Sequence, residues 1–567
     1  VFFPIVFMDG TTGRLFREFS IVVSGSVIIS SFAALTFTPM LATKLLIKRE
    51  QQSWFYRKTE PFFEGMNRVY SQSLAAFLKR RWIALPFTIV TILLIGVLWN
   101  TIPAEMAPLE DRSQISINTM GAEGVTYEYI RDYTEDINHL VDSIIPDAEA
   151  VTARVSSGSG NVRITLKDMK DRDYTQMEVA EKLSKAVQKK TMARSFVQQS
   201  SSFGGRRGGM PVQYVLQATN IEKLQEVLPK FMTKVYENPV FQMADVNLKF
   251  SKPEARININ RDKASIMGVS TKNIAQTLQY GLSGQRMGYF YMNGKQYEIL
   301  GEINRQQRNK PADLKGIYIR SDNGNMVQLD NLIELTGGIA PPKLYRYNRF
   351  VSATISAGLA DGKTIGQGLD EMDKIAKETL DETFRTALTG DSKEYRESSS
   401  SLMFAFILAI VLIYLILAAQ FESFKDPLII MLTVPLAIAG ALVFMYFGDI
   451  TMNIFSQIGI IMLIGLVAKN GILIVEFANQ KQEAGEDKMR AIKDASLQRL
   501  RPILMTSAST ILGLIPLAFA TGEGCNQRIA MGTAVVGGML ISTLLTMYIV
   551  PAIYSYVSTN RSKLKTE

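Results

Sequence analysis

Long apolar runs alternate with one polar stretch along this chain, and the lengths of the runs predict where it crosses a membrane. The hydrocarbon core of a bilayer is about 30 Å thick, so a helix needs about 20 apolar residues to span it. Two such runs precede the polar stretch and five follow it within residues 397–556, which predicts a polytopic α-helical membrane protein. The predicted spans are residues 20–46, 82–102, 401–419, 427–447, 454–475, 503–519 and 532–556.

The first residues, VFFPIVF, form one more apolar run. It has neither the positively charged start nor the cleavage site of a signal peptide. We interpret residues 1–19 as the tail of a transmembrane helix whose beginning is missing, followed by a loop. Residues 47–81 mix aromatic and charged side chains at helical spacing, which predicts an amphipathic helix on the inner leaflet; a soluble connecting helix is the alternative.

Basic residues orient the predicted spans. Nine Lys/Arg and three Asp/Glu lie from Lys44 to Arg81, six Lys/Arg lie from Asn479 to Arg501, and three lie in the tail, 557–567. All three groups fall on one side if the spans alternate, and cytoplasmic loops carry such an excess of positive charge. The sequence therefore predicts a cytoplasmic location for these groups and an outer location for residues 103–396.

The outer stretch alternates between strand-like and helix-like periods. Strands are expected at residues 113–118, 150–154 and 162–166, with helices at 127–145 and 174–189, and the same order restarts with a strand at 212–218 and a helix at 221–236. This repetition predicts two split β-α-β, or ferredoxin-like, subdomains. The first is 103–207, and the second is 208–255 together with 349–396; the glycine-rich residues 204–209 link them.

Residues 256–348 break this pattern and are interpreted as a third subdomain inserted into the second. The sequence MNGK at 292–295 predicts a hairpin, and DNG at 322–324 predicts a turn. The second subdomain is expected to resume near residues 350–358.

Composition excludes several classes of function. The net charge of +9 comes from basic residues beside the apolar runs, which favours anionic lipid over nucleic acid as a partner. The single cysteine, Cys525, excludes an internal disulfide framework, and the single histidine argues against a zinc site. Glycine-rich segments near Ser156 and Gly281 lack the lysine and the serine or threonine of a phosphate-binding loop. We therefore predict neither an enzyme nor a bound cofactor.

Lys469 is the most informative residue, because it lies in the otherwise apolar run IGLVAKNGILIVEFAN and no predicted span supplies a carboxylate to pair with it. A charge at membrane depth costs about 3 kcal/mol or more, and such residues mark ion or proton pathways. The alternative is a lysine that snorkels to the headgroups, which would have to pass about a turn and a half of apolar helix.

Two residues of the next predicted span are expected near Lys469. If the two helices are neighbours, Thr506 lies at a similar depth and Arg499 lies at the cytoplasmic mouth of the same region, while Asn470 assists by hydrogen bonding. A buried lysine needs a partner or loses its proton, so the carboxylate must come from another chain or from upstream sequence. Alternatively, Thr506 bonds only its own helix, and Arg499 is only an anchor at the interface.

Several stretches resemble the C-terminal half of a resistance–nodulation–division (RND) efflux permease of the multidrug type. The most specific are GLVAKNGILIVEFAN (465–479) and RLRPILMTS (499–507). FESFKDP (421–427), VPLAIAGA (434–441) and LTFTPMLATKLL (35–46) extend the likeness over the whole chain.

The resemblance implies the inner-membrane pump of a tripartite efflux system in a Gram-negative bacterium, which exports amphiphilic small molecules and is driven by the proton-motive force. It implies a homotrimer that works with a periplasmic adaptor and an outer-membrane channel. The periplasmic stretch would form two porter subdomains and, at 256–348, a docking subdomain. Lys469, Arg499 and Thr506 match the family's proton-relay positions, with Asn470 in support; the family's aspartates lie in its other half.

We accordingly expect about four further spans, a second outer loop and intramembrane aspartates upstream of Val1, since such transporters are built from repeated halves. We also expect the 567-residue chain alone not to transport.

One departure concerns the loop between two strands of the first subdomain. Multidrug members are rich in phenylalanine and glycine there, whereas residues 156–161 read SSGSGN. Two other functions stay open: an RND metal-ion exporter, which would carry intramembrane acids in this half, and a membrane scaffold or sensor that does not transport.

Overall fold

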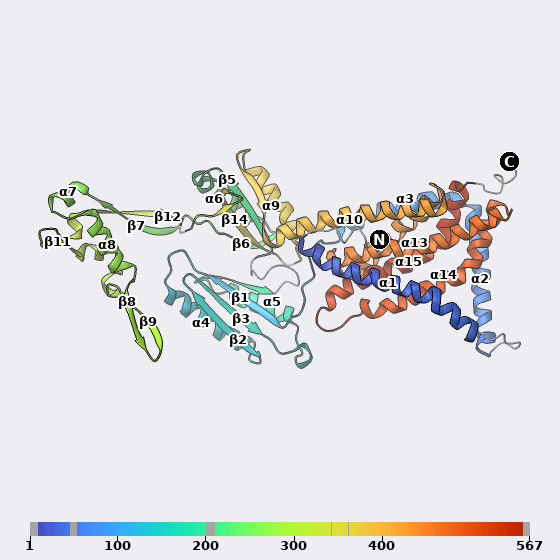
Figure 1. Ribbon diagram of the computed structural model, residues 1–567, viewed down its shortest axis with the longest axis horizontal. Coiled ribbons are helices and arrows are strands. Elements are labelled where there is room, and N and C mark those ends of the chain that lie inside the picture. The colour runs from blue at the N-terminus through green and yellow to red at the C-terminus, as the bar shows by residue number, and fades with distance from the viewer. Residues whose placement is uncertain (1–9, 46–53, 200–209, 342, 361, 560–567) are drawn as a thin grey trace. The chain divides into compact units, whose positions relative to one another are not determined.

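The computed structural model describes residues 10–45, 54–199, 210–341, 343–360 and 362–559 (Figure 1). Contacts divide the chain into a small unit, made of residues 121–130 and 248–345, and a large unit that comprises the rest. Three sequence-based interpretations fall outside the described residues: the apolar run 1–7, the linker 204–209 and nearly all of the tail 557–567.

Seven helical segments of the described chain are long and apolar enough to span a membrane, and each predicted span falls in one of them. They are α1 (Gly10–Leu45), α3 (Ala84–Thr101), α10 (Gly390–Phe421), α11 with α12 (Asp426–Met431 and Thr433–Phe447), α13 (Ile454–Glu483), α14 (Lys488–Ala518) and α15 (Cys525–Val557).

Most of these helices continue beyond their apolar runs. Residues 10–19 are helical, so the prediction of a loop there is wrong. Helix α14 begins at Lys488, well before the predicted span at residues 503–519, because the Asp487 side chain caps it by accepting a hydrogen bond from the Met489 N–H (3.1 Å). Pro502 lies inside this helix without ending it. Apolar length therefore marks the part that fits a bilayer, whereas the caps set the ends of the helix.

The fourth span is broken between α11 and α12. Pro435 lies in the first turn of α12. A proline ring clashes with the carbonyl four residues before it, which here belongs to Met431, the last residue of α11. The proline therefore explains why the regular helix is interrupted at Leu432.

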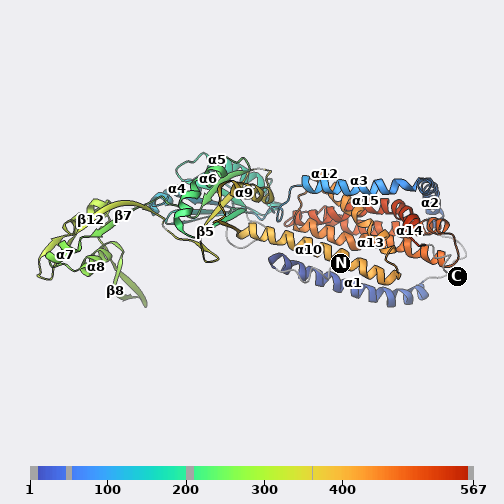
Figure 2. The same ribbon diagram turned by 90° about the horizontal axis from the view of Figure 1, so that it is seen from above.

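Helix α15 packs closely against α12 and α13, and Figures 1 and 2 show α13, α14 and α15 side by side. The contact depends on glycines. A Cβ added to Gly538 would lie 2.3 Å from Leu463 Cδ1 and 2.9 Å from the Ala437 oxygen, and one added to Gly537 would lie 2.4 Å from Phe444. Helices in a bilayer associate through such close packing of small residues, since lipid is as apolar as leucine.

The predicted amphipathic helix is present as α2 (Trp54–Lys79). Its buried side, with Leu74 and Leu78, packs against α14 and α15. Tyr70 donates a hydrogen bond from its hydroxyl to the Met547 carbonyl (2.7 Å). The helix is therefore attached to the bundle, and its place on the inner leaflet stays a prediction.

The first sheet follows the order β1 (Gln114–Met120), α4 (Tyr127–Ile144), β2 (Ala150–Ser156), β3 (Ser159–Thr165), α5 (Gln176–Gln188) and β4 (Arg194–Gln199). The strands pair antiparallel in the order β2-β3-β1-β4. Both helices pack on one face, where Ile117 and Val162 of the sheet meet Ile137 of α4 and Leu183 of α5.

Two local predictions in this sheet need correction. The expected loop at 156–161 is a tight hairpin, because Gly158 has a φ of +83° and the ladder continues to the Ser156–Ser159 pair. Helix α5 begins at Gln176 rather than at Tyr174, since the Thr175 side chain accepts a hydrogen bond from the Glu178 N–H (3.2 Å) and caps the helix.

The second sheet repeats this order with β5 (Val212–Ala218), α6 (Ile221–Glu237), β6 (Phe241–Val246), β14 (Phe350–Leu359), α9 (Ile365–Thr379) and β15 (Arg385–Leu388). Its strands lie in the equivalent order β6-β14-β5-β15, with the short β13 (Arg346–Tyr347) also pairing with β14. The chain leaves this sheet after β6 and returns at β13.

The small unit contains the excursion. Strands β7 (Lys252–Ile259) and β12 (Ile333–Ala340) pair along their full length. Between them lie α7 (Arg261–Ile266), α8 (Thr271–Leu282), the hairpin β8–β9 (Gln285–Met292 and Lys295–Gly301) and the pair β10–β11 (Tyr318–Arg320 and Met326–Gln328).

Both predicted turns of the small unit are confirmed. Asn293 and Gly294 have φ angles of +51° and +72°, as the favoured two-residue hairpin turn requires, and Gly324 has a φ of +85°. The unit also includes residues 121–130, which the sequence analysis had assigned to the first subdomain. Arg305 ties them to the insertion through two hydrogen bonds to the Glu128 carboxylate (2.5 and 2.9 Å), and this contact lowers the pKa of Glu128 to about 2.

We expect Gly538→Val to destabilise the bundle, because the new side chain would have to displace Leu463 and the backbone of Ala437. Overpacking of this kind costs about 1–3 kcal/mol or more. The thermal midpoint of the purified natural protein in detergent measures the effect. Gly96→Ala is the control, since nothing lies within 4 Å of its added Cβ. Equal midpoints for both variants would show that the glycine contact is not needed.

Candidate functional site

Lys469 lies on the least buried stripe of α13. Positions 467, 468, 470 and 471 around it are buried, whereas Lys469 is half-buried. The stripe follows the three- and four-residue spacing of one helix face. Its members are Met462, Gly465, Leu466, Lys469, Ile472, Leu473 and Glu476. The ammonium group is thus carried on the side of α13 that this chain packs least.

Within the part of the chain that the structure describes, Lys469 has no hydrogen bond or ion pair. A buried carboxylate does contact α13, but at another level: Asp426 of α11 accepts a hydrogen bond from Asn479 Nδ2 (3.1 Å). Asn479 is ten residues beyond Lys469, or about 15 Å along the helix. Asp426 is therefore too far along the bundle to neutralise Lys469.

Helices α13 and α14 are neighbours, and one hydrogen bond fixes their relative level. Asn470 Nδ2 donates to Ser507 Oγ (3.4 Å), and both side chains are at most 2% exposed. This bond places residues 469 and 470 beside residues 506 and 507, as the sequence analysis expected. It also shows that the Asn470 amide bonds to α14 rather than to Lys469. Asn470 Oδ1 is buried and has no partner among the described residues.

Thr506 lies next to the bonded serine but is turned away from it. Its hydroxyl donates to the Ile503 carbonyl of its own helix (3.1 Å), and the side chain is exposed in this chain. The back-bonded conformation that the sequence analysis kept as an alternative is therefore the one observed. The role of Thr506 in proton transfer stays a prediction.

Arg499 lies toward the end of α13 that carries Asn479. Its guanidinium stacks 4.5 Å from the centre of the Phe477 ring, and its Nε has no hydrogen-bond partner in the described chain. Phe477 is eight residues beyond Lys469, or about 12 Å along α13. Arg499 thus lies at the predicted mouth of the region, held by a cation–π contact rather than by a carboxylate.

Arg501, on the same helix as Arg499, connects α14 to α2. It forms two hydrogen bonds with the Glu60 carboxylate (2.9 and 3.5 Å) and stacks 4.2 Å from the centre of the Phe63 ring. The two arginines of the RLRP segment therefore have different partners: Arg499 contacts α13 and Arg501 contacts α2.

A buried polar network near the same end links α11, α13 and α15. Asn479 donates to Asp426, Tyr554 donates from its hydroxyl to Asn479 Oδ1 (2.5 Å), and Gln482 Nε2 donates to the Tyr554 hydroxyl (2.6 Å). All four side chains are at most 2% exposed. The network supplies a hydrogen bond to a buried carboxylate and satisfies the polar side chains around it, as burial of polar groups requires.

Ser507, Phe477 and this network were not predicted from the sequence. Ser507 follows Thr506 directly in the sequence, and the rotation of α14 about its axis decides which of the two hydroxyls faces α13. The network could have been suspected from the sequence, since Asn479 and Gln482 follow an apolar run and Tyr554 ends another.

Comparisons with known proteins agree with this architecture. A model of the AcrB/AcrD/AcrF family matches residues 1–558. An uncharacterized transporter of Haemophilus influenzae is 30% identical over 574 aligned residues, which cover 100% of this chain and 56% of that protein. The chain thus spans about half the length of the curated relative it matches.

We expect the Asn470–Ser507 hydrogen bond to contribute a coupling free energy of about 0.5–2 kcal/mol. Ser507→Ala should lower the thermal midpoint, because it leaves the buried Asn470 amide without its partner. The double variant Asn470→Leu/Ser507→Ala should recover part of the loss, since no buried polar group then lacks a partner.

Thr506→Ala is the matched control for this cycle and should change the midpoint little, because that hydroxyl bonds only its own helix. Additive losses in the double variant would contradict the pairing.

Proposed function

Because the chain belongs to the AcrB/AcrD/AcrF family of RND permeases, we propose that it works as part of a proton-driven exporter of amphiphilic small molecules. The observation that carries the proposal is Lys469, an ammonium group at membrane depth with no carboxylate at its level in the described chain. Such a charge is costly in a bilayer and is retained where it moves ions or protons.

The least buried stripe of α13 is the natural place for the missing partner. Lys469 would meet carboxylates of another segment of the natural protein on this side. When those carboxylates are ionised, they hold the ammonium by charge. When they take up protons, the attraction is lost, Lys469 releases its own proton more readily, and α13 is free to move. Proton binding to the carboxylates would in this way cause α13 to move.

The surroundings of Lys469 suit such a movement. The Asn470–Ser507 bond ties α13 to α14, so the two helices would shift together. Arg499 lies on Phe477 with an unpartnered Nε in the described chain, and it would attract carboxylates or water at the cytoplasmic mouth of the pathway. Thr506 would have to give up its bond to the Ile503 carbonyl in order to donate a hydrogen bond within the relay.

The remaining parts fit an efflux pump of the inner membrane of a Gram-negative bacterium. We assign the two sheets as ferredoxin-like porter subdomains, which their shared β-α-β-β-α-β order and strand order support. The small unit would be the docking subdomain, and residues 103–396 would lie in the periplasm. The working assembly would be a homotrimer with a periplasmic adaptor and an outer-membrane channel.

We expect Lys469→Ala in the natural protein to abolish dye efflux while dye binding stays largely intact, because the lysine acts at membrane depth and not on the substrate. Lys469→Arg should also fail, since a guanidinium is wider than an ammonium and does not release its proton. Thr506→Ala should be milder and should lower efflux without abolishing it, because its hydroxyl bonds the Ile503 carbonyl of its own helix.

Efflux from cells and equilibrium dye binding to the purified protein measure these effects. Lys481→Ala is the matched control, because this lysine of the same helix has carboxylate partners of its own, Glu486 (3.0 Å) and Asp494 (4.0 Å). Wild-type efflux from Lys469→Ala would identify the lysine as a snorkelling anchor and refute the proton-coupled mechanism.

A further inference from the structure

Residues 103–113, here called the connector, lead from α3 to β1 of the first sheet. Their backbone begins by pairing with the segment before α13. Met452 donates its N–H to the Pro103 carbonyl (2.8 Å), Glu105 donates to the Met452 carbonyl (3.0 Å), and Ile454 donates to the Met106 carbonyl (3.2 Å). Ile454 is the first residue of α13, so the connector holds the start of the helix that carries Lys469.

The connector then caps α15 from outside that helix. The first turn of α15 has no acidic residue, and its N-cap, Gly524, has no side chain to supply a hydrogen bond. Glu110 fills this role: its Oε1 accepts a hydrogen bond from the Gln527 N–H (2.8 Å), and the residue is only 2% exposed. Asn526 adds a second tie by donating from Nδ2 to the Leu109 carbonyl (2.7 Å). A buried carboxylate is well placed at the positive end of a helix.

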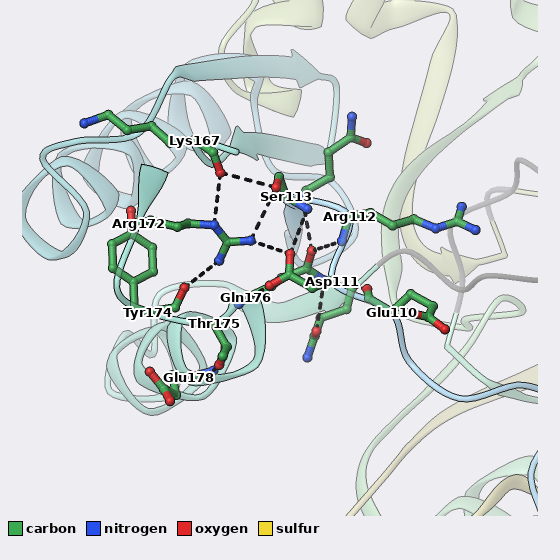
Figure 3. Close-up of polar contacts among 12 residues, drawn as sticks. Glu110, Asp111, Arg112, Ser113, Lys167, Arg172, Tyr174, Thr175, Gln176 and Glu178 are labelled. Atoms are coloured by element: carbon green, nitrogen blue, oxygen red, sulfur yellow. Dashed lines mark hydrogen bonds and ion pairs between the residues drawn. The ribbon is translucent and has the colours of Figure 1, made fainter. Parts of the chain in front are cut away.

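The next residue, Asp111, does the same for a helix of the first sheet. Its Oδ2 accepts a hydrogen bond from the Gln176 N–H (2.9 Å) at the first residue of α5. Its Oδ1 accepts from the Ser113 N–H (3.1 Å) and from Arg172 (Figure 3). Burial raises the pKa of Asp111, but the hydrogen bonds from Gln176, Arg172 and Ser113 outweigh this effect and hold the pKa below its usual range.

Arg172 and Gln176 lock this end of the connector to the sheet. The Arg172 side chain is fully buried and donates to the carbonyls of Lys167 (3.0 Å) and Tyr174 (2.8 Å). Gln176 Oε1 accepts hydrogen bonds from the N–H groups of Arg112 (2.9 Å) and Gln114 (3.1 Å). Figure 3 shows these side chains converging on the connector from α5 and from the segment before it.

The connector also stores backbone strain at its end. Ser113 has a φ of +56°, a left-handed conformation that costs a residue with a side chain free energy. Its N–H and hydroxyl are both engaged, the former by Asp111 and the latter with Lys167 and Arg172. The network therefore holds the connector in one shape and opposes bending beside β1.

From this arrangement we propose that Glu110 and Asp111 form a rigid joint that transmits movement of α13 and α15 to the first sheet, with Glu110 as a positioning residue for transport. The two adjacent carboxylates cap helices of different parts, one in the membrane bundle and one on the sheet. Because these adjacent residues belong to a strained, hydrogen-bonded segment and are each held at a helix end, displacement of α15 would carry α5 with it. The inference rests on the proposed proton-driven export and adds a route by which that movement leaves the membrane.

The test compares Glu110→Ala with Glu110→Gln in the natural protein, reconstituted in vesicles with a pH gradient. Glu110→Ala removes the acceptor for the Gln527 N–H. We expect efflux to fall about tenfold, within the usual range of coupling between sites, with unchanged dye affinity. Proton flux without dye should persist, but dye should no longer accelerate it. Glu110→Gln keeps a carbonyl acceptor and should restore efflux to near the wild-type rate.

Two further variants complete the design. Asn526→Ala breaks the second tie at an exposed side chain and should lower efflux by a smaller factor, which keeps the test valid if Glu110→Ala does not fold. Glu181→Ala is the control, because this acid of α5 forms only an exposed pair with Lys185. It should behave as wild type.

The joint is refuted if Glu110→Ala, or Asn526→Ala in its place, leaves efflux and dye-stimulated proton flux unchanged, or if Glu110→Gln fails as severely as Glu110→Ala. A parallel loss of dye affinity and thermal midpoint would also overturn it, because Glu110 would then serve only the fold. Lys469→Ala, measured in the same vesicles, separates the two proposals. Normal efflux from that variant would remove the proton relay, whereas impaired efflux beside a normal Glu110→Ala would remove only the joint.

Discussion

The cost of a charge inside a bilayer is the constraint on which this structure depends. Lys469 is preceded and followed by apolar residues of its own helix, and it has no ion-pair partner among the described residues. Its helix, α13, otherwise packs closely against three neighbours, α12, α14 and α15. In the proposed mechanism, a carboxylate from another segment of the natural protein meets this ammonium on the least buried stripe of α13. The rest of the bundle can be understood as the frame that holds this one charge in place.

The bundle is held by close glycine packing between α15 and its neighbours, and by polar contacts near one end of α13. Gly537 and Gly538 bring α15 against α12 and α13 so closely that no side chain fits between them. Near the end of α13 that carries Asn479, polar contacts add to the apolar packing: Asp426 accepts a hydrogen bond, and Arg499 and Arg501 stack on aromatic rings. A change in the charge state of Lys469 would therefore act on a body of several helices rather than on a single side chain.

The connector extends this body beyond the membrane segments. Glu110 and Asp111 cap α15 and α5 from adjacent positions, and the strained Ser113 beside them is held by hydrogen bonds on both sides. Hydrogen bonds between buried groups transmit displacement because breaking one leaves a polar group without a partner. In the proposed mechanism, chemistry at the level of Lys469 and movement of the first sheet are thus parts of one process.

The sequence by itself determined the spans, the opening strands and helices of both sheets and both turns of the small unit, because each depends on local period or turn chemistry. It did not predict β4, β6, α9 or β15. The cost of an isolated charge singled out Lys469, whose role stays a proposal. The sequence also placed residue 469 at the level of residue 506, which follows from the helical rise. It did not determine which adjacent hydroxyl faces α13, since a rotation of about 100° separates Thr506 from Ser507 and only packing fixes it. Nor did it reveal the network around Asp426 or the joint at Glu110. Those contacts join residues tens to hundreds of positions apart, so only the tertiary structure decided them.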